Sequence, residues 1–253
     1  GAPDGNTWLW MPNCKTDEVG ELNAVYNCQI YNEAGYPVMG EQPAQVAFYP
    51  YQSWWMFQAR NLFVDKDNNA IFSVQDCRVN SLIQSTTVYK ISPTGEQLWG
   101  KDGVTVTGTM DNFILVSFGG IQLEDGSYVF AWTNCMDYVG EFWVGTSRVS
   151  ADGKVLQEAS KLDLGKTTHQ YCWLANAGNN QYFLVYTEGS GDIVKVMKYD
   201  FDGTPVWSKA VEVYNGGFGS SPAWFKIEVQ SVPDGGVLID YYADPESTNF
   251  EDP

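Results

Sequence analysis

The chain has 253 residues, a length that suits one large domain or two small ones. Its 14 Lys and Arg against 31 Asp and Glu give a net charge of −17, which excludes binding to the phosphate backbone of nucleic acids. Hydrophobic residues make up 44%, enough for a sizeable core, and no apolar run reaches the roughly 18 residues of a transmembrane helix, so neither general disorder nor membrane insertion is predicted.

A thirteen-residue segment recurs five times along the chain, at residues 2–14, 65–77, 123–135, 177–189 and 232–244. Its third and fourth residues are Asp-Gly, Asp-Asn or Asn-Asn, which readily take the positive φ angles of a tight hairpin turn. Its seventh and eighth residues are both apolar, as in Ile71 and Phe72. Two consecutive apolar residues predict that both faces of each strand are covered.

A second turn recurs four times between these segments, at residues 32–39, 92–99, 150–157 and 200–207. The segments before it, such as 193–199, alternate as strands do. Each module therefore has two hairpins, and four-stranded all-β modules repeating every fifty to sixty residues predict a β-propeller. A β-sandwich is less consistent with the sequence, because it does not predict a repeated turn at a fixed position.

We expect one domain over residues 1–253, with about four to five blades, either complete or part of a longer propeller. Its modules lie at roughly 1–50, 51–107, 108–165, 166–215 and 216–253.

Two of the second turns carry a family resemblance. VYKISPTGEQLWG (88–100) and VMKYDFDGTPVWS (196–208) resemble the repeats of quinoprotein-type (PQQ-like) propellers, in which a Trp follows the turn glycine by four residues. Met39 and Gln157 replace this Trp in the other modules. The resemblance implies the propeller architecture of secreted bacterial proteins that bind sugars, proteins or cofactors. It implies no quinone site, because the adjacent cysteine pair of the quinone-dependent dehydrogenases is absent.

The composition also predicts a location and a cysteine chemistry. Charged residues are only 18%, while aromatic residues reach 15%, which suits a secreted or cell-surface protein. There is one histidine, and the five cysteines include no Cys-x-x-Cys pair, so we expect no zinc site, no metal and no cofactor. The cysteines are expected to be mostly buried free thiols, with Cys28 in the core.

The connections between blades are predicted to lie on one loop-rich face and to hold the ligand. They contain aromatic rings that stack on sugars, together with an acid and the single histidine. The predicted ligand-binding residues are Trp54, Trp55, Asp111, His169, Tyr171 and Trp224. Alternatively, the rings begin the inner strands and pack between blades.

The same face is predicted to be acidic, with carboxylates at Asp76, Asp111, Asp137, Glu141, Glu188, Asp192 and Asp244. Two such groups are what glycosidic cleavage needs, although loop carboxylates are ordinarily solvated. Three arginines, Arg60, Arg78 and Arg148, would form a sialidase-like carboxylate clamp only if all three converged. The run Asp65, Asp67 and Asn69 has oxygen ligands for calcium, but a hairpin turn also explains it.

Because no catalytic constellation is complete, the sequence favours a non-catalytic, extracellular propeller that binds a carbohydrate or a protein. A glycoside hydrolase or lyase using loop carboxylates is the alternative. A structural segment of a larger surface protein is a further alternative.

Overall fold

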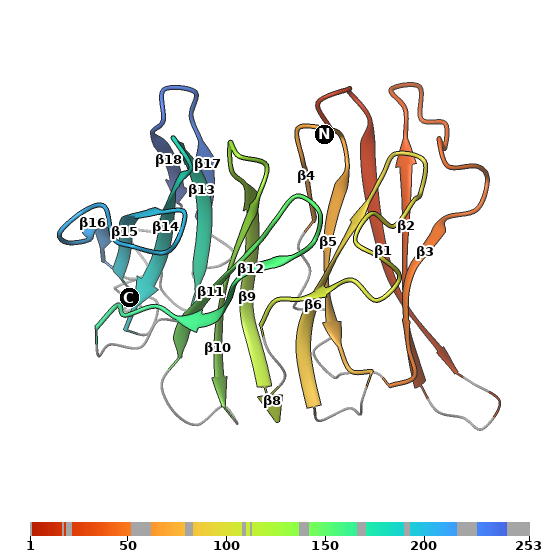
Figure 1. The fold of residues 1–253 in the computed structure, drawn as a ribbon, viewed down its shortest axis with the longest axis horizontal. Coiled ribbons are helices and arrows are strands. Elements are labelled where there is room, and N and C mark those ends of the chain that lie inside the picture. Colours follow the sequence, from red (N-terminus) through yellow and green to blue (C-terminus); the bar gives the residue numbers. More distant parts are fainter. Residues whose placement is uncertain are drawn as a thin grey trace, which may run out of the picture. The chain divides into compact units, whose positions relative to one another are not determined.

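A computed structural model of the chain describes residues 2–16, 18, 22–51, 62–78, 83–107, 110–111, 113–136, 142–165, 171–189, 193–216 and 227–241. The side chains of residues 14–16, 22, 83–84, 110–111, 113–116 and 134–136 lie outside this description. The described residues form strands and turns and no helix, so the predicted all-β class is confirmed (Figure 1). In this part of the chain, no helix is long and apolar enough to cross a bilayer.

The strands form five antiparallel sheets, called sheets 1 to 5 in chain order. Sheet 1 contains β1 (Thr7–Thr16), β2 (Leu22–Tyr31) and β3 (Ala44–Tyr49). Sheet 2 contains β4 (Leu62–Val64), β5 (Ala70–Asp76), β6 (Ile83–Ile91) and β7 (Val104–Thr105), and β8 (Met110–Asp111) also pairs with β6. Sheet 3 contains β9 (Phe113–Gln122), β10 (Tyr128–Met136), β11 (Trp143–Val149) and β12 (Val155–Lys161). Sheet 4 contains β13 (Cys172–Gly178), β14 (Gln181–Glu188), β15 (Ile193–Asp200) and β16 (Val211–Asn215), and sheet 5 contains β17 (Ile227–Ser231) and β18 (Val237–Tyr241).

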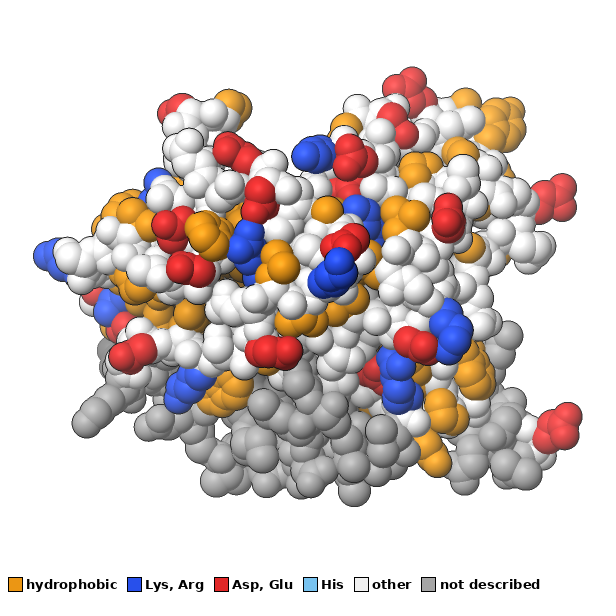
Figure 2. All heavy atoms as spheres, in the orientation of Figure 1, with side chains coloured by type: hydrophobic (Ala, Val, Ile, Leu, Met, Phe, Trp, Pro, Cys, Tyr) orange, Lys and Arg blue, Asp and Glu red, His pale blue; other side chains and the backbone are white. Residues whose placement is uncertain are grey.

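The chain divides into two compact units. Unit 1 is Gly1–Leu115 with Ser147–Ala159, and unit 2 is Val116–Thr146 with Ser160–Pro253. The boundary of a single domain over 1–253 stays a prediction. On the face shown in Figure 2, acidic side chains are interspersed with basic and hydrophobic ones rather than gathered in one patch.

The predicted turns of the thirteen-residue segment are all present. The fourth residue of four copies has a positive φ, which is 83° at Gly5, 63° at Asn68, 84° at Gly126 and 80° at Gly235. In each, the amide of this residue donates to the carbonyl three residues earlier, as Gly5 does to Ala2. In the remaining copy both Asn179 and Asn180 have positive φ, which makes a two-residue turn of the primed type.

The second turn also forms as predicted, with positive φ at Gly35, Gly95, Gly153 and Gly203. Trp99, which follows Gly95 by four positions, contacts the next copy of this turn. Trp99 is 8% exposed, its Nε1 donates to the Ala151 carbonyl at 3.1 Å, and a Cβ added at Gly153 would lie 2.8 Å from its ring. Trp99 therefore packs against the second turn of the following module.

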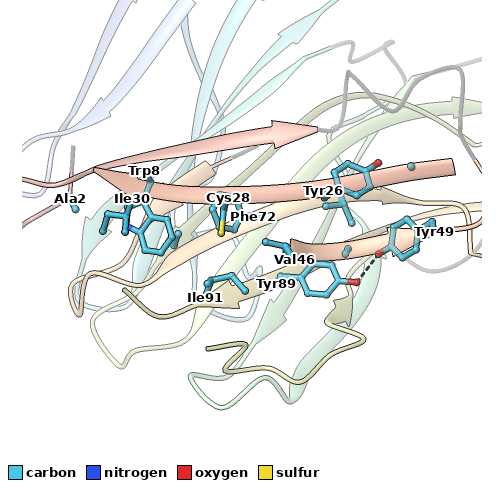
Figure 3. Packing of buried hydrophobic residues seen from close by; sticks show 14 residues of the cluster. Ala2, Trp8, Tyr26, Cys28, Ile30, Val46, Tyr49, Phe72, Tyr89 and Ile91 are labelled. Atoms are coloured by element: carbon cyan, nitrogen blue, oxygen red, sulfur yellow. Dashed lines mark hydrogen bonds between the residues drawn. The ribbon is translucent and has the colours of Figure 1, made fainter. Parts of the chain in front are cut away.

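The core of unit 1 lies between sheets 1 and 2 (Figure 3). Trp8 meets Phe72 edge-on, with ring centroids 5.9 Å apart. The Tyr49 and Tyr89 hydroxyls share a hydrogen bond of 2.8 Å, so these rings are buried without losing their polar contacts. Trp8 is the seventh residue of one thirteen-residue segment and Phe72 is the eighth residue of the next. The seventh residue of the segment in sheet 1 therefore packs against the eighth residue of the segment in sheet 2.

In unit 2, too, a seventh residue and the eighth residue of the next segment share a hydrophobic cluster. Val129 and Leu184 lie in one cluster, and Phe183 and Ile239 lie in another. The prediction that both faces of every strand are covered holds for β5, β10 and β14. It is wrong for β1 and β18, where Leu9 is 45% and Leu238 is 53% exposed. Only one face of each of these two strands is covered by residues that the structure describes.

Three cysteines, Cys28, Cys77 and Cys172, are buried free thiols, and the prediction that Cys28 lies in the core is confirmed. Burial raises the pKa of Cys28 and of Cys172 to about 12. We expect neither thiol to be alkylated by iodoacetamide at pH 8 in the native state, because only about one in ten thousand would be a thiolate there. Peptide mapping by mass spectrometry, before and after unfolding in urea, tests this. Rapid labelling of the native protein at either cysteine would contradict it.

The same pKa values predict how the free energy of unfolding depends on pH. Unfolded thiols ionise near pH 9, whereas these two keep their protons to about pH 12. Their contribution to stability is therefore complete below pH 9 and is lost as the pH rises towards 12.

Candidate functional site

Four of the six predicted ligand-binding residues, Trp54, Trp55, His169 and Trp224, lie outside the described residues. Asp111 lies in β8, but its side chain is also outside the description. Only Tyr171 can be placed in full.

Tyr171 immediately precedes β13 and is half-buried. Its ring centroid lies 6.4 Å from that of Trp173, and both rings pack against the cluster that joins sheets 4 and 5. Its amide donates to the Thr187 hydroxyl at 3.1 Å. The structure therefore gives this ring a packing role, and its contact with a ligand stays a prediction.

Asp76 and Arg78, both considered for chemistry, hold each other at the end of β5. The Arg78 Nε donates to both carboxylate oxygens of Asp76, at 2.7 and 3.0 Å, and the Thr87 hydroxyl donates to one of them at 2.7 Å. The hydrogen bonds from Arg78 to Asp76 raise the pKa of the guanidinium further above its usual range. The same guanidinium donates to the Asp102 carbonyl at 2.9 Å. Since Asp76 and Arg78 serve each other, neither is suited to acid–base catalysis or to a substrate clamp.

The oxygen-rich run at 65–69 is a turn stabilised by its own acid. One carboxylate oxygen of Asp65 accepts the backbone amides of Asp67 and Asn69, at 2.9 and 2.8 Å. The other lies 3.2 Å from the Lys90 ammonium. Asp65 therefore stabilises the turn through its hydrogen bonds and forms an ion pair with the buried Lys90. No group of three or more His, Cys, Asp or Glu side chains that could hold a metal occurs among the described residues.

A groove of about 650 Å³ lies over β14 and β15 in unit 2, and we call it the β14–β15 groove. Strand alternation creates it, because residues directly opposite each other in an antiparallel pair share a face. Tyr186 pairs with Lys195 and Leu184 with Met197, so Tyr186, Lys195 and Met197 lie on one face of sheet 4. Tyr171 and Trp173 lie on the opposite face, with the cluster that faces sheet 5.

The polar lining of the groove consists of two carboxylates, two ammonium groups and a hydroxyl, from Asp163, Glu188, Lys195, Lys209 and Ser208. Lys195 and Glu188 form an ion pair of 2.7 Å whose side chains are 24% and 12% exposed. Asp163 is exposed and accepts the Gly165 amide at 3.2 Å.

The aromatic lining consists of Tyr186, Tyr199 and Trp207, and the remaining lining residues are Leu164, Met197, Pro205 and Ala210. Burial, and secondarily the nearby Glu188 charge, raises the pKa of Tyr186 to about 12. Burial also raises the pKa of Tyr199, with smaller effects from Tyr186 and Asp163. Both hydroxyls therefore stay protonated at neutral pH and are able to donate hydrogen bonds.

Chemically, the β14–β15 groove offers the half-buried ring of Trp207, fixed hydrogen-bonding groups and equal numbers of positive and negative charges. Sequence reasoning found Glu188 as a loop acid and Trp207 as a repeat residue, but it did not bring the two together. Asp163, Lys195 and Lys209 carried no signal of their own. Alternation along β15 would have placed Lys195, Met197 and Tyr199 on one face.

The fold is similar to that of solved glycoside hydrolases. The α-L-arabinofuranosidase Arb93A from Fusarium graminearum, in complex with an iminosugar inhibitor, matches with a TM-score of 0.52 and 13% identity over 95% of this chain and 80% of that one. A structure of the GH93 α-L-arabinofuranosidase of the same organism with arabinobiose matches with a TM-score of 0.53 and 12% identity, over 94% of this chain and 74% of that one. The α-L-arabinanase of Penicillium chrysogenum with arabinobiose matches with a TM-score of 0.51 and 10% identity, over 91% of this chain and 74% of that one. No protein-family model and no curated protein matches the sequence.

These similarities confirm that the chain has the β-propeller fold, with about four to five blades. They also correct the functional prediction. The non-catalytic binding propeller is wrong as the leading interpretation, because the similar structures are glycoside hydrolases and favour the alternative.

Proposed function

We propose that this chain is a glycoside hydrolase, and that its first substrate class to test is a polysaccharide containing α-L-arabinose. The observation that supports this most is the propeller similarity to arabinose-specific hydrolases over more than nine-tenths of the chain. A net charge of −17 is compatible with a neutral polysaccharide and unfavourable for polyanions.

Glycosidic cleavage uses two carboxyl groups, one as proton donor and one as base or nucleophile. Asp76 and Glu188 are already held by Arg78 and Lys195, so both are poor candidates. The remaining loop acids are the proposed catalytic groups: Asp111, Asp137, Glu141, Asp192 and Asp244. In the same proposal, Trp54, Trp55, His169, Tyr171 and Trp224 contact the sugar.

Amide substitution of these five acids, one at a time, should identify the catalytic pair. We expect two of the five variants to lose about 100-fold or more in kcat on debranched arabinan, because each catalytic acid or base contributes about that much. Glu96→Gln, a change at an exposed acid of a second turn, is the control and should keep full activity. Reducing-sugar release is the measurement. Wild-type protein that releases no product from arabinan or from other neutral polysaccharides between pH 4 and 8 would refute the hydrolase.

We also propose that the protein works outside the cytoplasm and that its modules are PQQ-like repeats. The support is the low charged fraction, the high aromatic fraction and the Gly-to-Trp spacing at Gly95/Trp99 and Gly203/Trp207.

A further inference from the structure

We propose that the β14–β15 groove is a glycan-binding site for a neutral sugar chain, lined by residues other than the loop carboxylates assigned to hydrolysis. The proposal goes beyond the hydrolase function, since it concerns binding alone and holds whether or not the bound chain is cleaved.

The charge of the lining selects the class of ligand. Asp163 and Glu188 are balanced by Lys195 and Lys209, so the groove has no formal net charge in a chain of net charge −17. A phosphate or carboxylate ligand would need an excess of cations, which the groove does not supply. A wholly apolar ligand would have to strip water from four charged groups without replacing it. A ligand that is uncharged but rich in hydroxyls needs no excess of cations, and its hydroxyls can replace the water around the charged groups.

The size and surface of the groove suit the same ligand. Its volume of about 650 Å³ lies within the roughly 300–1,000 Å³ typical of small-molecule sites. Trp207 is half-buried and gives the groove its apolar stacking area, whereas Tyr186 and Tyr199 are each 3% exposed and contribute to its base. A sugar ring has apolar C–H faces and a rim of hydroxyls, which match flat rings and hydrogen-bonding groups respectively.

The groove is also organised before any ligand arrives. The Lys195–Glu188 ion pair is 2.7 Å long and mostly buried, and Tyr186 is 3% exposed. Side chains already held in one geometry lose little conformational entropy on binding, so their contacts contribute more to affinity.

Affinity electrophoresis tests the proposal, using gels that contain arabinan, laminarin or xyloglucan as neutral polysaccharides and polygalacturonate as the anionic one. We expect at least one neutral polysaccharide to retard the wild-type protein and polygalacturonate to leave it unretarded. Trp207→Ala should weaken that binding by about tenfold, as loss of an aromatic anchor does, and Trp207→Phe should restore most of it. The matched control is Phe201→Ala, because Phe201 lies on the same hairpin, is 39% exposed and does not line the groove.

If Trp207→Ala fails to fold, the double variant Asp163→Ala/Lys209→Ala takes its place, because both residues are exposed. Each groove variant is also assayed for hydrolysis of a short chromogenic arabinofuranoside, which should be unchanged. A loop-acid variant that has lost hydrolysis should still be retarded. The proposal is overturned if no neutral gel retards the protein, if polygalacturonate retards it equally, or if the folded groove variants bind as the wild type does. Retardation through the groove without any cleavage would refute the hydrolase alone.

Discussion

Replacing Asp65 with alanine is expected to lower the free energy of unfolding by about 3–5 kcal/mol, because it removes one partner of a buried ion pair. The Asp65 side chain is fully buried, the Lys90 side chain is 8% exposed, and their charged atoms lie 3.2 Å apart. Alanine would leave the Lys90 ammonium in a low-dielectric environment without this carboxylate. It would also remove the acceptor for the backbone amides of Asp67 and Asn69.

Three further variants separate the charge from the turn. Asp65→Asn keeps an acceptor for the turn but loses the ion pair, so it should be less harmful than alanine. Asp65→Leu with Lys90→Met removes both charges and should recover much of the lost stability, as replacement of a buried pair by apolar residues does. Asp67→Ala, at an exposed acid of the same turn, should change stability by about 0.5 kcal/mol or less. Urea unfolding followed by circular dichroism measures all four. If Asp65→Ala resembled Asp67→Ala, the buried pair would have no role in stability.

The buried acid shows what a single sequence reveals and what it hides. Asp65 occupies the first position of the thirteen-residue segment, where the other copies have Ala2, Leu123, Ala177 and Val232. A lone acid in an apolar column indicates a buried carboxylate with a dedicated partner. The partner is on β6, more than twenty residues away, and only the pairing of β5 with β6 brings it close. The local run predicted the hairpin turn, with calcium as the alternative, and it gave no sign of the Lys90 partner that tertiary pairing supplies.

Turns and strand alternation were predictable because they depend on neighbouring residues. The positive φ angles at Gly5 and Asn68 follow from residue type alone. The groove was not predictable, because Asp163 follows β12 of sheet 3 whereas Trp207 lies between β15 and β16 of sheet 4, and only tertiary packing brings both to one groove. The exposure of Leu9 and Leu238 was missed for the same reason, since a doubly apolar strand does not reveal which of its faces a neighbour covers.

Replacing Gly145 with alanine is expected to destabilise unit 2 by about 1–3 kcal/mol, through overpacking against a buried ring. Gly145 lies on β11, and a Cβ added there would be 2.5 Å from Cε2 and Cζ2 of Trp132 on β10. Trp132 is fully buried, so its ring has no solvent to move into. Relief would require shifting either the ring or the strand, and close-packed interiors resist both.

A double-mutant cycle distinguishes this clash from a general intolerance of change at Gly145. Trp132→Ala alone should cost about 3–5 kcal/mol, because it leaves a large cavity. In the Trp132→Ala background, Gly145→Ala should cost far less than it does alone, since its methyl group then enters the cavity. Trp132→Phe is the conservative control, which removes the part of the indole nearest to Gly145 while keeping an aromatic ring. Unfolding in urea, monitored by far-UV circular dichroism, gives the four free energies. If the effects of Gly145→Ala and Trp132→Ala were simply additive, the close approach of strand and ring would not be what requires glycine at this position.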